Sequence, residues 1–449
     1  MSKDEGRPHD ERCTFCSKGR RQVRNLIAGP PGIYICNECV ELCNTILVEH
    51  QSGAPAPGTP SLSGEPGARE RDDVARGSGT DLSLERLPRP SGIVDLLNQY
   101  VIAQDHAKKV LAVAVYAHYR RMLARQQDST ETSGVEIEKS NILFVGPTGS
   151  GKTLLARTLA RILDVPFAIA DATTLTEAGY VGEDVENIIL KLVQAADYNV
   201  ARAQQGIIFI DEIDKVSRTT SNVSITRDVS GEGVQQALLK LLEGSVANVP
   251  PQGGRKHPEQ QYIQVDTRDI LFIAGGTFAG IEEIVSRRIG GGAIGFGDGT
   301  RNDDAAREAN RLIAQVTSED LVEYGLIPEF VGRMPIVAPL ASLSVSELVR
   351  TLTEPRNALI RQYQALFALE GCELEFTPEA LEEIARSALK LKTGVRAARS
   401  IIEARMLDVT YNLPERGSDL RYVVTPGFVR GDEEITVVPR GTDVQRESA

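Results

Sequence analysis

An eight-residue glycine-rich segment constrains the fold of this chain more than any other feature of its sequence. Gly146–Thr153 reads Gly-Pro-Thr-Gly-Ser-Gly-Lys-Thr and directly follows the apolar run Asn141–Val145. It satisfies the phosphate-loop pattern, in which glycines let backbone N–H groups wrap phosphate oxygens at the positive end of the following helix. The segment therefore predicts a buried strand, a nucleotide-binding turn and a helix, in that order.

Side chains in and after this loop predict ATP hydrolysis with magnesium. Lys152 should contact the β- and γ-phosphates, and the Thr153 hydroxyl should bind Mg²⁺. A later apolar run, Gly206–Ile210, ends in Asp211, which would hold the hydrated Mg²⁺, and Glu212, which would orient and deprotonate the attacking water. Alone, such a pair is as often an ordinary strand end, but beside a phosphate loop it indicates an ATPase. The expected nucleotide contacts of the loop are Gly146, Pro147, Thr148, Gly149, Ser150, Gly151, Lys152, Thr153 and Leu154.

The pattern of apolar runs and helical stretches in the central and C-terminal sequence predicts an α/β fold. Short apolar runs at Ile142–Val145, Ile207–Ile210 and Ile270–Ala274 alternate with turns and helical stretches. That alternation is typical of a parallel sheet with helices on its faces. After Pro339 the pattern becomes mainly helical, for example over Ser346–Leu369, so we expect a helical small domain behind the sheet domain. Further elements are expected as a helix at Pro378–Leu391 and a strand at Arg421–Thr425.

The cysteines predict a separate metal module. Five of the six lie between Cys13 and Cys43, and a disulfide framework would be unexpected in a large cytosolic chain. Cys13-x2-Cys16 and Cys36-x2-Cys39 have the spacing of a four-thiolate structural zinc site, which leaves no open position for catalysis. A chance grouping of buried thiols is the alternative. We expect Cys13, Cys16, Cys36 and Cys39 to bind zinc and the metal to supply folding energy for this short segment.

Composition divides the chain into parts. Residues 1–50 form the expected zinc domain, and residues 51–90, of which 21 of 40 are Gly, Pro, Ser or Ala, form a flexible linker. Residues 91–339 are the expected large ATPase domain and residues 340–430 the small domain. Residues 431–449 are expected to form a C-terminal tail.

Charge and hydropathy disfavour two kinds of partner. The 62 acidic residues exceed the 50 basic ones, giving a formal net charge of −12, which argues against nucleic acid as the main partner. The longest apolar run, Val110–Ala117, is much shorter than the ~20 residues that span a bilayer. The N-terminal residues also lack the apolar stretch of a signal peptide. These features favour a cytoplasmic protein that contacts neither membrane nor nucleic acid.

Five segments outside the phosphate loop carry a family resemblance: Leu26-Ile-Ala-Gly-Pro30, Tyr34-Ile-Cys-Asn-Glu-Cys39, Tyr100-Val-Ile-Ala-Gln104, Ile327-Pro-Glu-Phe-Val-Gly-Arg333 and Thr393-Gly-Val-Arg396. They resemble the ClpX family of AAA+ protein unfoldases. The resemblance covers most of the chain and implies a homohexameric ATPase. In this family the segment corresponding to Tyr100–Gln104 contacts adenine, which assigns that contact to Val101 and Ile102. The chain has Ala103 where the family usually has glycine.

The same resemblance implies roles for two arginines. Arg333 resembles the finger that reaches the γ-phosphate of a neighbouring subunit, and Arg396 resembles the second sensor, on the small domain of the same subunit. The planar guanidinium of arginine binds phosphate oxygens bidentately, although most single arginines form only surface ion pairs. The chain lacks the glycine commonly found after the sensor arginine. The first sensor is poorly marked, and Thr277 is its candidate.

Four loops would contact protein partners. Tyr180 and Val181, between two glycines, resemble the pore loop that grips substrate, and Ser217–Gly231 resembles the second pore loop. The basic triplet Arg255, Lys256 and His257 resembles the loop at the pore entrance, although alone it would be a solvated turn. In the glycine-rich stretch 290–299, Ile294, Gly295 and Phe296 match the tripeptide by which ClpX proteins dock on the ClpP peptidase.

These features together predict an ATP-dependent protein unfoldase that delivers substrates to a ClpP-type peptidase and also acts as a chaperone without it. The zinc module would bind substrates and adaptors and mediate self-association. The sequence has neither a Gly-x-Ser-x-Gly elbow nor a His-Glu-x-x-His motif, so we expect no peptidase activity of its own. Two alternatives remain: a nucleic-acid motor built on the same ATPase core, and a remodelling chaperone that uses the pore but not Ile294–Phe296.

Overall fold

The computed structural model describes residues 12–16, 18–20, 22–28, 33–40, 87–126, 137–176, 183–217, 231–250, 262–290, 302–391 and 394–440. The chain divides into two compact units, Met1–Ser78 and Gly79–Ala449. In the first unit, β1 (Leu26–Ala28) and β2 (Tyr34–Cys36) form an antiparallel pair. Beside this small hairpin, three buried cysteines make up the only well-buried side chains in the described part of the unit, so its core is built around sulfur.

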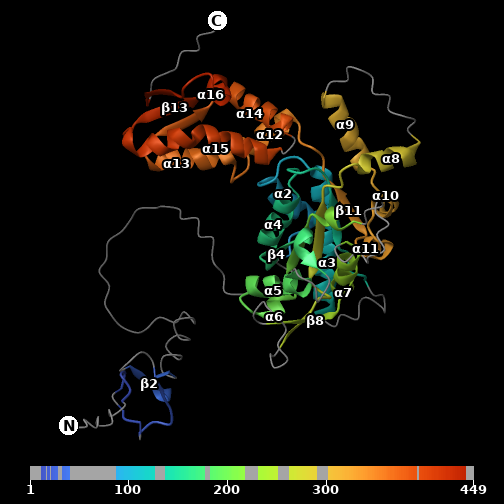
Figure 1. Ribbon diagram of the computed structural model, residues 1–449, viewed down its shortest axis with the longest axis vertical. Coiled ribbons are helices and arrows are strands. Elements are labelled where there is room, and N and C mark those ends of the chain that lie inside the picture. The colour runs from blue at the N-terminus through green and yellow to red at the C-terminus, as the bar shows by residue number, and fades with distance from the viewer. Residues whose placement is uncertain are drawn as a thin grey trace, which may run out of the picture. The chain divides into compact units, whose positions relative to one another are not determined.

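A five-stranded parallel sheet forms the centre of the second unit (Figure 1). The order across the sheet is β11-β3-β10-β7-β4, so the strand that carries the phosphate loop, β3, lies between β10 and β11, which is the last strand of this sheet along the chain. Parallel strands covered on both faces are apolar throughout, which is why these strands read as continuous apolar runs in the sequence. Their bounds are β3 (Ile142–Val145), β4 (Phe167–Asp171), β7 (Ile207–Asp211), β10 (Leu271–Gly276) and β11 (Ile336–Pro339).

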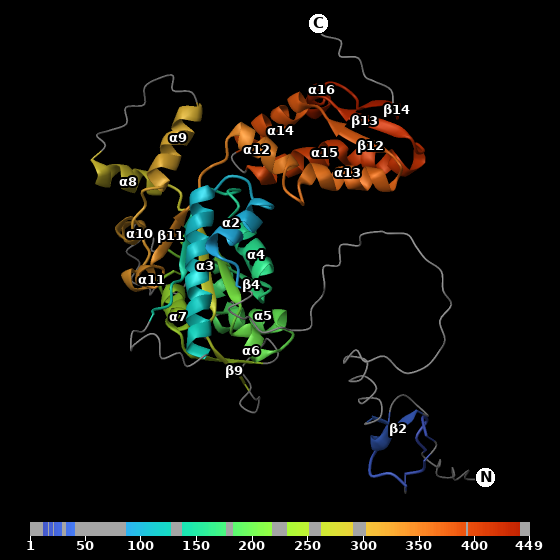
Figure 2. The same cartoon turned by 180° about the vertical axis from the view of Figure 1, so that it is seen from behind.

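Successive residues of each strand enter different cores because side chains alternate across a sheet. On one face Phe144 and Phe209 pack with α2 (Pro90–Asn98), α3 (Asp105–Gln126) and α4 (Lys152–Leu163). Figure 2 shows the long helix α3 running along the sheet domain.

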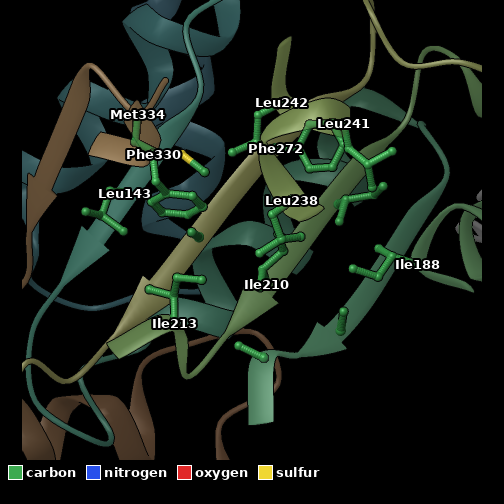
Figure 3. Packing of buried hydrophobic residues seen from close by; sticks show 14 of the residues in the cluster. Leu143, Ile188, Ile210, Ile213, Leu238, Leu241, Leu242, Phe272, Phe330 and Met334 are labelled. Carbon is green, nitrogen blue, oxygen red and sulfur yellow. The ribbon is translucent and has the colours of Figure 1, made fainter. Parts of the chain in front are cut away.

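The opposite face is the larger core. Leu143, Ile210 and Phe272 pack there against Leu238 and Phe330 from the covering helices (Figure 3). Those helices are α5 (Glu186–Ala195), α7 (Glu232–Glu243), α8 (Ile281–Ile289), α10 (Ser318–Tyr324) and α11 (Pro328–Gly332).

Further elements complete this part of the molecule. They are the 3₁₀ turns η2 (Ala172–Thr174) and η3 (Ile213–Val216), the helices α6 (Val200–Ala203) and α9 (Asn302–Ile313), and the strand pairs β5 (Leu175–Thr176) with β6 (Glu183–Asp184) and β8 (Val246–Val249) with β9 (Ile263–Asp266). Together with the sheet and its two helical layers, they confirm the α/β fold predicted from the sequence.

The small domain combines helices with a three-stranded sheet. The helical run expected over Ser346–Leu369 is two helices, α12 (Val345–Thr353) and α13 (Leu359–Leu369), because Pro355 has no N–H to continue the first one. The expected strand is β13 (Leu420–Val424), and the sequence did not indicate its neighbours β12 (Glu373–Phe376) and β14 (Thr436–Pro439). The remaining elements are α14 (Pro378–Lys390), α15 (Val395–Asn412), η4 (Leu413–Glu415) and α16 (Pro426–Arg430).

No helix among the described residues has the length and apolar composition needed to cross a membrane. The proposed linker lies almost entirely outside the described residues, and the domain boundaries given above remain predictions.

Candidate functional site

The phosphate loop joins the end of β3 to the start of α4, where the sequence pattern predicts it. Gly146 lies against the segment that follows β11, and a Cβ at this position would overlap the carbonyl oxygen of Leu340. Gly151 has a φ of 99°, in the left-handed region that glycine adopts freely. The first residue of α4 is Lys152, so the N–H groups of the first helical turn open toward the loop. The loop is therefore shaped to receive phosphate.

Lys152 and Thr153 project from the start of α4 into the same site. Lys152 is buried, and its Nζ donates to the carbonyl oxygens of Gly146 at 2.6 Å and Pro147 at 3.0 Å. Burial lowers the pKa of Lys152, and the facing carboxylates of Asp211 and Asp214 oppose that shift. A cation held inside the loop by carbonyl oxygens can exchange them for phosphate oxygens.

Thr153 meets the first of the two carboxylates at the end of β7. Its Oγ1 donates to Asp211 Oδ2 at 2.9 Å. A hydroxyl and a carboxylate oxygen at this distance are the hard oxygen ligands that Mg²⁺ prefers, and Mg²⁺ usually keeps several waters besides one or two protein ligands. This donor set fits a magnesium ion bound together with nucleotide phosphates.

Glu212 follows Asp211 in an unusual backbone conformation. Its φ is 57°, in the left-handed region, and its N–H donates to Asp211 Oδ1 at 3.0 Å. This turn ends β7, and the next residues form η3. Successive residues of a strand point to opposite faces of a sheet, but because of this turn Asp211 and Glu212 both line the same pocket.

The pocket around these groups has a volume of about 260 Å³. The sheet domain contributes Val101 and Ile102, the loop residues Thr148–Leu154, and both carboxylates. The small domain contributes Arg396. The structure thus brings together most of the nucleotide-site residues predicted from the sequence. Gly146 and Pro147 instead accept hydrogen bonds from Lys152 through their carbonyl oxygens.

Arg396 lies in the first turn of α15 and faces the phosphate loop. The N-cap residue Gly394 has a φ of 54°, and a Cβ there would lie 3.8 Å from Gly149 Cα. The positive charge of Arg396 also contributes to lowering the pKa of Lys152, so the two cations face the same space. This arrangement suits binding of a multiply charged anion, and the missing glycine after Arg396 does not displace it, since Ala397 packs in the small-domain core.

Arg333 does not line this pocket. It ends α11, and its Nη2 donates to Glu243 Oε1 at 3.1 Å, with both side chains about half exposed. Its carbonyl oxygen accepts a bond from Asn141 Nδ2 at 2.9 Å. An arginine held at the surface beside one carboxylate is free to meet a second molecule, but the role in a neighbouring subunit remains a prediction.

Thr277, the candidate first sensor, lies at the end of β10 and lines the pocket. Its Oγ1 is 3.4 Å from Thr148 Oγ1, and its N–H donates to Asp214 Oδ1 at 3.1 Å. Asp214 is nearly fully buried and had not been singled out in the sequence. The sequence signal for Asp214 is weak: it is a third carboxylate two residues after Glu212, and nothing in the local pattern shows that it is buried.

The four cysteines of the first unit converge as the sequence predicts. Their Sγ atoms all lie within 4.8 Å of one another, with Cys13 and Cys39 separated by 3.8 Å and Cys16 and Cys36 by 3.6 Å. Four sulfurs bound tetrahedrally at the usual Zn–S distance of about 2.3 Å are about 3.8 Å apart. The Cys36 N–H also donates to Cys13 Sγ at 3.3 Å, as expected for a thiolate ligand. The cluster fits a structural Zn²⁺.

Several predicted contact residues lie outside the described residues, so their positions are not assigned. These are the pore-loop residues Tyr180 and Val181, residues 218–230 of the predicted second pore loop, the basic triplet Arg255, Lys256 and His257, and the docking tripeptide Ile294, Gly295 and Phe296.

Comparison with family models agrees with this geometry. A model described as AAA domain (Cdc48 subfamily) matches residues 137–337, which hold the sheet and the phosphate loop. A model described as the C-terminal, D2-small domain, of ClpB protein matches residues 343–418. The parallel sheet, the phosphate loop and these two matches define an AAA+ P-loop ATPase with a helical small domain.

A third model identifies the N-terminal module. It is described as the ClpX C4-type zinc finger and matches residues 11–49, which include the four converging cysteines. Together the three matches point to the ClpX family, and the resemblance inferred from the sequence is confirmed. They support a Clp-type AAA+ ATPase chaperone that binds nucleotide and zinc.

Proposed function

We propose that this chain is an ATP-dependent protein unfoldase and translocase that passes substrates through a hexameric pore to a ClpP-type peptidase. The observation that best supports the proposal is the joining of two domains at one nucleotide pocket, where Arg396 of the small domain faces Lys152 and the phosphate loop. A nucleotide bound there would contact both domains. ATP hydrolysis would therefore change the contacts between the two domains, and a motor requires such a link between hydrolysis and domain movement.

The pocket residues would divide the chemistry among them. Lys152, Arg396 and the loop N–H groups would bind the triphosphate of ATP, with Val101 and Ile102 against the adenine. Thr153 and Asp211 would hold Mg²⁺, which offsets charge on the phosphate oxygens when it is bound. Glu212 would orient the attacking water and accept its proton. The chain would cleave only ATP and leave peptide hydrolysis to its partner.

The position of Arg333 supports the proposed ring. Its guanidinium lies at the surface, bound to Glu243, and is not part of the pocket of its own chain. An exposed pair of this kind contributes little to stability, so exchanging Glu243 for a phosphate would cost little. We infer that Arg333 completes the pocket of a neighbouring subunit in a homohexamer, where its bidentate donors would contact the γ-phosphate.

Protein substrates would be gripped by the pore loops. Tyr180 and Val181 would press on any polypeptide, and Arg255, Lys256 and His257 would attract substrate tails at the pore entrance. Ile294 and Phe296 would anchor the peptidase, and without it the chain would act as a chaperone in the cytoplasm. The zinc module would bind adaptors and substrates.

The pore-loop assignment is tested by Tyr180→Ala, with Tyr180→Phe as the matched control because it keeps the ring and removes only the hydroxyl. We expect Tyr180→Ala to hydrolyse ATP at close to the normal rate but to unfold a tagged fluorescent protein several times more slowly, because hydrolysis is no longer coupled to pulling. Loss of reporter fluorescence and phosphate release, measured on the same sample, check this. A Tyr180→Ala protein that unfolds the reporter as fast as wild type and Tyr180→Phe would show that Tyr180 does not grip substrate.

A further inference from the structure

The adenine-facing wall of the pocket ends in a turn that residues with side chains rarely adopt. Val101 and Ile102 line the pocket, and the next two residues, Ala103 and Gln104, have φ angles of 55° and 62°. Both lie in the left-handed region, where the Cβ atom crowds the backbone. Two successive residues of this kind persist only where other contacts hold them in place.

The buried side chain of Gln104 supplies such contacts. Its Nε2 donates to the carbonyl oxygen of Ala341 at 2.8 Å and to that of Ser150 at 3.3 Å. Its Oε1 accepts from the Ala341 N–H at 2.9 Å. One amide group thus makes three hydrogen bonds to backbone, two of them with the same residue, while only 8% of Gln104 is exposed. A buried amide with its donors and acceptor in use fixes its own position closely.

The partners of Gln104 belong to different parts of the molecule. Ser150 is in the phosphate loop. Ala341 lies in the connection between β11, the last strand of the large sheet, and α12, the first helix of the small domain. The preceding residue Leu340 donates its N–H to Val145 at 2.8 Å, which keeps this connection beside the start of the phosphate loop. Gln104 therefore links the adenine-facing wall, the phosphate loop and the path to the small domain.

Lys108 holds the same wall from its other end. Its buried Nζ donates to the carbonyl oxygen of Val101 at 2.7 Å and to Asn98 Oδ1 at 2.8 Å. These bonds fix the wall as far as Val101. The left-handed turn that follows is held by the Gln104 amide.

We propose that Gln104 is a positioning residue for nucleotide: its amide locks the turn at Ala103–Gln104 and so places Val101 and Ile102 against the adenine. This rests on the proposed placement of adenine in the pocket. Without the amide, the turn would relax toward negative φ and the wall would move. The phosphate loop would lose only the long bond to the Ser150 carbonyl oxygen at 3.3 Å and would keep its shape, because Gly151 and the bonds of Lys152 hold it.

Binding of ADP and of pyrophosphate by the full chain tests the proposal, since only ADP carries adenine. Gln104→Met keeps the length of the side chain and removes all three bonds. By calorimetry with Mg²⁺ we expect ADP to bind about tenfold more weakly, which corresponds to about 1.4 kcal/mol, while pyrophosphate affinity changes less than about twofold. Gln194→Met, at an exposed glutamine of α5, is the matched control and should change neither affinity. If Gln104→Met does not fold, Gln104→Asn gives the same comparison, because it keeps a polar amide that is one methylene too short to reach Ala341 and Ser150 together.

A second substitution tests the mechanism. Ala103→Gly removes the cost of the left-handed conformation at that residue, so in the Gln104→Met background it should restore part of the lost ADP affinity. Failure to restore any would overturn the role of the turn. Unchanged ADP affinity in Gln104→Met, or an equal loss for ADP and pyrophosphate, would overturn the positioning role. A wild-type chain that binds ADP no better than pyrophosphate would instead contradict the proposed adenine site itself.

Discussion

Replacing Glu212 by glutamine should separate nucleotide binding from hydrolysis. The left-handed turn at Glu212 is held by its backbone N–H, which donates to Asp211 Oδ1 at 3.0 Å and does not involve the side chain. Glutamine therefore keeps the shape of the pocket and removes only the basic oxygen. A positioned general base contributes about 10²–10⁴-fold to rate, or about 3 to 5 kcal/mol of barrier at 1.36 kcal/mol per decade. The hydrolysis rate at saturating ATP should fall by that factor, while ATP affinity stays close to normal.

The assay pairs steady-state phosphate release with calorimetric binding of ATP and Mg²⁺. Lys152→Ala is the contrasting variant, because it removes the buried cation from the phosphate loop and should weaken binding itself. A Glu212→Gln protein that hydrolysed ATP at the wild-type rate would refute the assignment of the base. Loss of binding equal to that of Lys152→Ala would show that Glu212 shapes the pocket instead.

Two further predictions concern the zinc module and the stability of the sheet domain. Cys39→Ser should release zinc, because only three of the four thiolate ligands remain, but it should leave the ATPase rate unchanged. Metal content and phosphate release measured on one sample check this. A parallel loss of ATPase activity would contradict independent folding of the zinc module. Asp320→Asn should lower the free energy of unfolding by about 2 kcal/mol at neutral pH, because the buried carboxylate accepts two hydrogen bonds from Arg288 at 2.8 and 2.9 Å. The control is Glu382→Gln, which removes the charge from an exposed ion pair and should change the free energy of unfolding little. Burial alone would raise the pKa of Asp320, but the bonds from Arg288 and from Thr317 hold it below its usual value. The stabilisation is therefore full above the unfolded pKa of about 4 and is lost as the pH falls further, so acid melting curves of wild type and Asp320→Asn should converge.

The sheet could be predicted because its strands are buried on both faces. Such strands leave uninterrupted apolar runs, and β7 and β10 begin within one residue of the runs recognised in the sequence. The phosphate loop and Asp211 could be expected to meet, since the carboxyl ends of parallel strands share one edge of a sheet. Local pattern was sufficient for these features.

Other features depend on contacts between distant residues. Nothing near Gln104 in the sequence indicates that its amide binds Ala341, 237 positions away. The left-handed φ of Ala103 is imposed by those contacts, against the local preference of alanine. Two strands of the small-domain sheet, β12 and β14, were not predicted because they have only four residues each and are partly exposed. Short, mixed segments of this kind carry little periodicity to read.

The central claim is that ATP hydrolysis in this chain drives protein substrates into a peptidase. The most direct measurement is degradation of a folded, tagged reporter by the full chain with a ClpP-type peptidase and ATP, for wild type and Phe296→Ala. We expect wild type to degrade the reporter only with ATP. Phe296→Ala should unfold it normally but fail to degrade it, because an apolar anchor lost from each docking loop around a ring weakens multivalent binding greatly. Normal degradation by Phe296→Ala would contradict the docking assignment, and no degradation by wild type would contradict delivery to a peptidase and favour a remodelling chaperone.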